Sequence, residues 1–210
     1  MHTTYLDWAA TAVPDSEIMK GMAEIAASHA GNPSSIHSMG RSSAALLEQT
    51  RKQCAALLGA KPSEIVFTSG GTESNNLVIS SFMRKKSGFG VVTTGIEHPS
   101  VFEPVQLLEE FGAELRIIKG RPNGCIDPAS IAESIDDKTD LVTVMLVSND
   151  TGAVQKIEKI SSIIREKERK RSRPIHFHCD MVQALGKVPI DLEKLSVDSA
   201  SFSAHKIKGP

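Results

Sequence analysis

The chain has 210 residues, 40% of them hydrophobic, and its 24 lysines and arginines nearly balance 25 aspartates and glutamates. This length allows one sizeable domain, or a domain and part of another, with a buried core. The balanced charge gives no support for a nucleic-acid partner, and no stretch approaches the roughly 18 apolar residues that span a bilayer, so no membrane association is expected.

The beginning of the chain lacks a charged region followed by a hydrophobic one, as a secretory signal would require, so we expect a cytoplasmic location. The three cysteines, Cys54, Cys125 and Cys179, are odd in number and widely separated. Their spacing suits neither a disulfide framework nor a compact zinc site. We therefore expect free thiols and no bound metal.

Residues 1–60 predict a helical arm. Helices are expected from Asp15 to Ala30 and from Ser42 to Leu58, because both stretches have helical periodicity. The segment between them, residues 31–35, reads Gly-Asn-Pro-Ser-Ser, which favours a turn and continues neither helix. We expect this arm to pack outside the sheet that follows.

From about Val66 onward, short apolar runs alternate with stretches of helical period, which is typical of an α/β protein with a mostly parallel sheet. Several of the runs are nearly all apolar, which predicts strands buried on both faces. The strands are expected at Ile65 to Thr68, Gly90 to Thr94, Glu114 to Ile118, Leu141 to Leu146, Ile175 to Cys179 and Ser199 to Ser203. The helices are expected at Thr72 to Lys85, Pro99 to Phe111, Pro128 to Ile135 and Ile157 to Arg169.

A glycine-rich turn, residues 69–72, lies between the first of these strands and the helix after it. Glycines let backbone amides point at an anion, Thr72 adds a hydroxyl, and a helix N-terminus favours negative charge, so a phosphate could bind here. An ordinary tight turn is the alternative. The segment lacks the lysine and the spacing of a nucleotide-binding P-loop.

Two further polar residues follow predicted strands. His98 comes after the strand that ends at Thr94, and Asn149 comes after the strand that ends near Val147. The carboxyl ends of strands in open α/β sheets are where ligands bind, so both side chains could meet a ligand. The alternatives are a helix cap for His98 and an ordinary Asn/Asp/Gly turn for Asn149.

Asp180 closes a buried apolar run and is followed by Gln183. A buried carboxylate needs a partner, which the protonated ring nitrogen of a cofactor would supply; the alternative is that Asp180 caps a helix beginning near Met181. His176 and His178 alternate with apolar residues in the same run, and no third ligand is spaced to complete a metal site. We interpret these histidines as strand residues.

The last residues place Lys206 shortly after a buried strand, among small and hydroxyl-bearing neighbours. Such a lysine is a candidate for a Schiff base, because an amine in its unprotonated form attacks an aldehyde. Ser203 and His205 could bind a phosphate beside it.

Taken together, these segments resemble the cysteine desulfurase family, which belongs to the class V aminotransferase superfamily of fold-type I pyridoxal-phosphate enzymes. The matching segments extend over essentially the whole chain, at residues 5–11, 31–35, 67–75, 97–98, 148–149, 180–183 and 201–206. The resemblance implies a three-layer α/β/α large domain over residues 61–210, with a mostly parallel mixed sheet. It also implies pyridoxal 5'-phosphate as the cofactor.

The resemblance further implies a role for each candidate residue. Lys206 would form the Schiff base and carry protons, while His98 would stack on the pyridine ring and move protons. Asp180 would pair with the ring nitrogen and Gln183 with the phenolic oxygen, which Asn149 would help to orient. The residues implied to hold the phosphate are Gly71, Thr72, Ser203 and His205.

The implied reaction converts L-cysteine to L-alanine and leaves the sulfur as a persulfide on an enzyme cysteine, for a sulfur-acceptor protein in iron–sulfur cluster assembly. The family is homodimeric, and its nucleophilic cysteine lies on a C-terminal loop that no cysteine of this chain matches. We therefore expect an N-terminal piece of a longer enzyme, incomplete at its C-terminus and inactive alone. Selenocysteine lyase or another class V enzyme is an alternative, as is a non-catalytic interaction module that keeps the fold.

Overall fold

The computed structural model describes residues 4–85 and 88–210. They form two compact units. The first, called the helical unit here, runs to Phe67 and includes Asp191–Glu193 and Ala204–Pro210; the second, the sheet unit, comprises Thr68–Ile190 and Lys194–Ser203. The domain boundary expected at residue 60 stays a prediction.

The helical unit contains the two helices expected in the arm, α1 (Ser16–Ser28) and α2 (Ser38–Leu58). Asp15 caps α1, because its side chain accepts hydrogen bonds from the first turn. The second helix begins four residues earlier than predicted, where His37 Nδ1 accepts a bond from the Gly40 backbone N–H. It ends at Gly59, whose φ of 69° is left-handed and favours glycine.

The strand predicted at Ile65 to Thr68 is wrong, since these residues form no regular structure. A short 3-10 helix, Pro62–Glu64, precedes them, and the Ile65 carbonyl accepts a bond from the Arg51 guanidinium of α2. The same guanidinium lies 5.0 Å from the centre of the Phe67 ring. The run has the composition of a strand, but contacts with a helix replace the pairing that a strand needs.

The sheet unit contains five parallel strands in the order β2-β1-β3-β4-β5, which confirms the predicted α/β class. The strands are β1 (Phe89–Thr94), β2 (Ala113–Ile118), β3 (Thr139–Thr143), β4 (His176–Asp180) and β5 (Ser199–Ser201). The third begins earlier and ends earlier than predicted, although the backbone N–H groups of Val144 and Leu146 still donate to His178 and Asp180 of β4.

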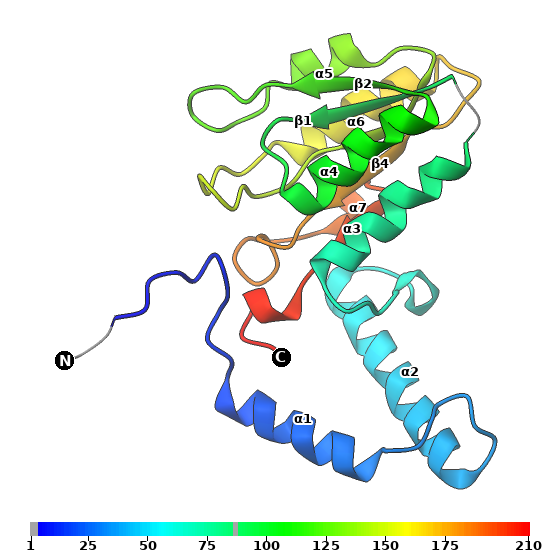
Figure 1. Cartoon of the computed structure of the whole chain (residues 1–210), viewed down its shortest axis with the longest axis vertical. Helices are drawn as coiled ribbons and strands as arrows, with labels where there is room; N and C mark the ends of the chain where they lie inside the picture. Colours follow the sequence, from blue (N-terminus) through cyan, green and yellow to red (C-terminus); the bar gives the residue numbers. More distant parts are fainter. Residues whose placement is uncertain (1–3, 86–87) are drawn as a thin grey trace. The chain divides into compact units, whose positions relative to one another are not determined.

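Helices cover both faces of the sheet. Figure 1 shows α4 in front of the strands and α6 behind them, and α3 packs with α4 as α5 packs with α6. These helices are α3 (Gly71–Ser80), α4 (Pro99–Leu107), α5 (Pro128–Ser134) and α6 (Ile157–Glu168), and a short helix, α7 (Leu192–Leu195), precedes β5 in the chain. Short 3-10 helices extend α3 and α4, at Ser81–Arg84 and Leu108–Phe111, and account for the longer helices predicted there. The three-layer arrangement is thus confirmed.

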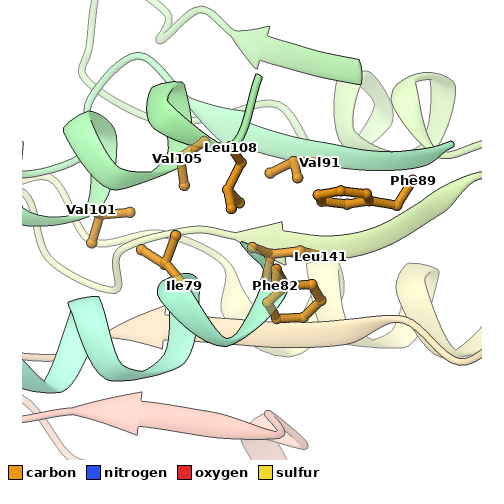
Figure 2. Packing of buried hydrophobic residues seen from close by; sticks show 8 residues of the cluster. All are labelled: Ile79, Phe82, Phe89, Val91, Val101, Val105, Leu108 and Leu141. Carbon is orange, nitrogen blue, oxygen red and sulfur yellow. The ribbon is translucent and has the colours of Figure 1, made fainter. Parts of the chain in front are cut away.

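The direction of winding reverses between β1 and β3, because β2 lies on one side of β1 and β3 on the other. In open α/β sheets, ligands bind at the carboxyl ends of strands beside such a reversal. The core beside this point joins α3 and α4 to the sheet (Figure 2). Its buried residues are Ile79, Phe82, Phe89, Val91, Val101, Val105, Leu108 and Leu141. None of the helices in the described ranges is long and apolar enough to cross a membrane.

Candidate active site

Glu97 links the loop that follows β1 to the loop that follows β3 through hydrogen bonds. Its Oε1 accepts hydrogen bonds from Thr94 Oγ1 at 2.6 Å and from the Met145 backbone N–H at 2.9 Å. Its Oε2 is buried and has no hydrogen-bond partner among the described residues. Burial, reinforced by the charge of Asp180 and opposed by the two hydrogen bonds, raises the pKa of Glu97 to about 7. A carboxyl group that keeps its proton close to neutrality therefore lies at the reversal point.

Asp180 ends β4 and is 5% exposed. Its Oδ1 accepts a bond from the Val182 backbone N–H at 2.9 Å, and its Oδ2 accepts one from Asn75 Nδ2 at 2.8 Å. The bond from the Val182 N–H is the one that a helix cap at Asp180 would accept, which is the alternative interpretation of the sequence. Residues 182–187, however, form turns and not a helix. The second bond reaches a side chain of α3, so the carboxylate is held from two directions.

His98 caps α4 and is exposed. Its Nδ1 accepts the Ser100 backbone N–H at 3.1 Å and lies 2.7 Å from Ser100 Oγ. The capping alternative is thus correct, and the same imidazole also borders a surface groove between α3 and α4. The groove is lined by Thr72, Asn76, His98, Pro99, Ser100, Glu103, Pro104 and Leu107.

Asn75 joins His98 to Asp180. Its Nδ2 donates both to Asp180 Oδ2 and, at 2.9 Å, to Ser100 Oγ, which in turn contacts His98. Sequence reasoning missed Asn75 and Ser100. A signal existed, since Asn75 lies four residues from both Gly71 and Ile79 and therefore shares their buried helix face.

The predicted phosphate site brings three segments together. A Cβ atom added to Gly71 would lie 2.6 Å from Val182 Cγ2, and one added to Gly70 would lie 3.9 Å from Ser203 Oγ. Gly71 is therefore required by close approach, and Ser203 lies beside the glycine turn. Thr72 is exposed in the first turn of α3, where backbone N–H groups lack partners within the helix and can bind an anion.

Gln183 and Asn149 are bonded locally. Gln183 is buried, and its Oε1 accepts a bond from Lys187 Nζ at 2.6 Å. Asn149 is half-buried, and its Nδ2 donates to Asp150 Oδ1 at 2.7 Å, within a turn that the Gly152 N–H closes onto the Ser148 carbonyl. The ordinary-turn alternative for Asn149 describes this loop, and the cofactor roles of both residues stay predictions.

Lys206 and His205 belong to the helical unit, within the 3-10 helix Ala204–Lys206. Lys206 Nζ donates to the carbonyl oxygens of Ala9 at 2.7 Å and of Ala10 at 2.6 Å. Its amine must leave these two carbonyls before it can attack an aldehyde. Partial loss of solvent and the charge of Lys206 lower the pKa of the His205 imidazole, although most of this side chain is exposed.

The three cysteines are free thiols, as predicted. Cys179 is buried in β4, and burial, with Glu97 and Asp180 nearby, raises the pKa of its thiol well above the ordinary value. Cys54 and Cys125 are each half-buried. His176 and His178 are strand residues, as interpreted, and the described residues include no cluster of three or more potential metal ligands.

Comparison with known proteins gives one consistent result. The model of the aminotransferase class-V family matches residues 4–210. The chain is 38% identical to a cysteine desulfurase IscS of Dictyoglomus turgidum over 98% of its length, and 40% identical to a putative cysteine desulfurase IscS 1 of Bacillus subtilis over 100%. It covers 51% and 54% of those two proteins, so it spans about half the length of the curated relatives it matches.

Two solved structures have the same fold as this chain. One is SspA in complex with cysteine, with a TM-score of 0.90 and 33% identity over 99% of this chain and 59% of that one. Another is a NifS-like protein, with a TM-score of 0.91 and 35% identity over 100% of this chain and 57% of that one.

Proposed function

The chain belongs to the aminotransferase class-V family, and we propose that it forms the cofactor-binding half of a pyridoxal-phosphate-dependent cysteine desulfurase. Two findings support L-cysteine as the substrate: the relatives carry the name cysteine desulfurase, and a structure with the same fold contains cysteine. Delivery of the sulfur to an acceptor protein, a homodimeric state and a cytoplasmic location are parts of the same proposal.

The observation that carries the proposal is the buried carboxylate of Asp180, held at the end of β4 by Asn75 and Val182. Pyridoxal phosphate supplies an aldehyde and a protonated ring that withdraws electrons. An anion in a buried site holds a proton on a ring nitrogen, because the opposite charge favours the protonated form. Asp180 meets this requirement.

The other residues provide the remaining contacts in the proposal. The backbone amides at Gly71 and Thr72 suit a phosphate, because they lie in the first turn of α3, where N–H groups lack partners within the helix, and the hydroxyl of Ser203 lies beside the glycine turn. The exposed imidazole of His98 would stack on the ring and move protons. Gln183 and Asn149 would bind or orient the phenolic oxygen, His205 would add a phosphate contact, and Lys206 would provide the amine.

A binding titration of this chain with pyridoxal phosphate tests the proposal. The wild-type chain becomes yellow on binding, and Lys206→Ala abolishes the colour because the site no longer contains an amine that can react. Asp180→Ala weakens binding about tenfold or more, since the ring nitrogen loses its counter-charge. Lys20→Ala, which removes an exposed lysine of α1, serves as the matched control and keeps the colour.

A well-folded wild-type chain that stays colourless contradicts the proposal and favours the non-catalytic module. Colour retained in Lys206→Ala contradicts the assignment of the amine.

A further inference from the structure

A continuous series of hydrogen bonds, buried at Asn75 and His178 and partly buried beyond them, extends from Asp180 across β4 and β5. Beyond Asn75, it includes His178 of β4, Ser199 of β5 and His176 of β4. Asn75 Oδ1 lies 3.0 Å from His178 Nε2, and Ser199 Oγ lies 2.8 Å from His178 Nδ1 and 2.8 Å from His176 Nε2. Asn75 and His178 are both 0% exposed, so water does not compete for the bond between them.

The orientation of the Asn75 amide follows from its neighbours. A carboxylate accepts hydrogen bonds and donates none, so the NH2 group of Asn75 must face Asp180 Oδ2. The second hydrogen of that NH2 group then points at Ser100 Oγ, and the amide oxygen faces His178. The reverse orientation would set two oxygen atoms against each other inside the protein.

The protonation of His178 follows from the orientation of Asn75. An amide oxygen only accepts, so His178 Nε2 carries a hydrogen and donates it. Burial lowers the pKa of His178 to about 3, and the imidazole is neutral at neutral pH. Its Nδ1 therefore has no hydrogen and accepts from Ser199 Oγ, which leaves Ser199 to accept from His176 Nε2.

The directions of the hydrogen bonds that connect Asn75 to His98 through Ser100 follow from the same reasoning. Ser100 Oγ accepts a hydrogen from Asn75, so its own hydrogen is directed to His98 Nδ1. The Ser100 backbone N–H points at the same nitrogen. With two donors at Nδ1, a neutral His98 carries its hydrogen on Nε2.

We propose that Asn75 is the positioning residue of this site, orienting the Asp180 carboxylate and the His98 imidazole together, and that His178 holds Asn75 in the one orientation that does both. Every hydrogen bond from His176 through Asn75 then points toward Asp180, and aligned donors stabilise an anion. The inference rests on the proposed function for its relevance to the cofactor, but the hydrogen-bond directions do not depend on it.

The tautomers of the histidines provide the first test, and no cofactor is needed. Long-range 1H–15N spectra of the wild-type chain at neutral pH should show His178 and His98 both with the hydrogen on Nε2. A hydrogen on Nδ1 of His178 overturns the proposal. This measurement needs no variant, so it decides the question even if a buried substitution prevents folding.

Two variants separate the branches. Asn75→Ala should release His178, so that it samples both tautomers, whereas Ser100→Ala should leave His178 as in the wild type. In both variants His98 keeps the Ser100 backbone N–H at Nδ1, so it should stay protonated on Nε2 while its Nδ1 resonance moves because the Ser100 hydroxyl is lost or no longer directed. Asn76→Ala is the matched control, because the side chain of Asn76 donates only to backbone oxygens in the same region, those of Thr72 and Ser100. A folded Asn75→Ala chain in which the His178 tautomer and the His98 Nδ1 resonance are both unchanged overturns the proposal.

The affinity for pyridoxal phosphate tests whether the positioning role of Asn75 affects cofactor binding. Asn75→Ala should weaken binding about tenfold, because Asp180 loses the donor that fixes Oδ2, and Asn76→Ala should bind at least several times more tightly than Asn75→Ala. Unchanged affinity in Asn75→Ala overturns the positioning role. If the wild type binds no cofactor but shows the expected tautomers, the proposed function fails while the hydrogen-bond directions stand.

Discussion

The two units differ sharply in how they bury apolar side chains. In the sheet unit, β1 and β3 are buried along their whole length, and the core joins them to helices on one face. In the helical unit, α1 buries no residue, and Leu6, Ile36 and Leu57 are 83%, 90% and 84% exposed. Hydrophobic burial is the main favourable term in folding, so the stability of this chain is concentrated in the sheet unit.

The largest expected effect comes from matched isoleucine truncations in the two units. Ile79→Ala empties a fully buried site in α3 and should lower the free energy of unfolding by about 2–5 kcal/mol. Ile25→Ala removes a side chain of α1 that is 50% exposed and should change it by less than about 0.5 kcal/mol. Urea unfolding of both variants measures the difference. Equal losses would refute the contrast between the units.

The second prediction concerns Glu97, which places a titrating group inside the sheet unit. Its pKa is about 7 in the folded chain against an ordinary 4.5, so between these pH values the folded chain keeps a proton that the unfolded chain has lost. Glu97 thus makes stability fall as pH rises, by about 3 kcal/mol over this range. Glu97→Gln should remove that fall, as measured by urea unfolding at a series of pH values. A pH dependence identical to that of the wild type would exclude this role.

The third prediction has the opposite sign and concerns His178. Its pKa is about 3 in the folded chain and ordinarily 6.5, so below pH 6.5 the unfolded chain binds a proton that the folded chain does not. Stability should therefore fall as pH falls, by about 2 kcal/mol between pH 6.5 and pH 5. His178→Gln should remove this contribution in the same titrations. Because Glu97 and His178 oppose each other, the two single variants should show slopes of opposite sign, and the double variant should be nearly flat.

The smallest effect is expected at the cap of α1. Asp15→Ala removes the bond that Asp15 Oδ1 accepts from the Glu17 backbone N–H at 2.9 Å, and should cost the helix about 1 kcal/mol. Since α1 buries no residue, the loss should increase hydrogen exchange in its first turn without changing exchange in β1. Faster exchange in both elements would mean that the units unfold together.

Much of the fold could be predicted because buried parallel strands are nearly continuous apolar runs. The strands β1, β2 and β4 lie within a residue of their predicted bounds, and β1 is such a run. The edge strand β2 is not, since it contains Glu114 and Arg116 and only its last residue is buried. The start of β3 was missed because Thr139 and Asp140 are polar. Asp140 is buried there with Lys85 and Arg173 as ion-pair partners from distant segments, which no local pattern reveals.

The candidate site, too, could be predicted only in part from the sequence. Gly71, His98, Asp180 and Ser203 could be located from the sequence, because each follows a predicted strand or begins a helix. The link between His98 and Asp180 through Asn75 could not, since it depends on side chains that are 25 and 105 residues apart in the chain. A local sign of that link in the sequence is that Asn75 lies on the same buried face of α3 as Gly71 and Ile79.

Chemical trapping tests the central claim most directly. The wild-type chain is incubated with pyridoxal phosphate, reduced with borohydride, digested and mapped by mass spectrometry. The proposed site predicts a pyridoxyl group on Lys206, absent from Lys206→Ala. A label on another lysine of the folded chain, or no label at all, would contradict it.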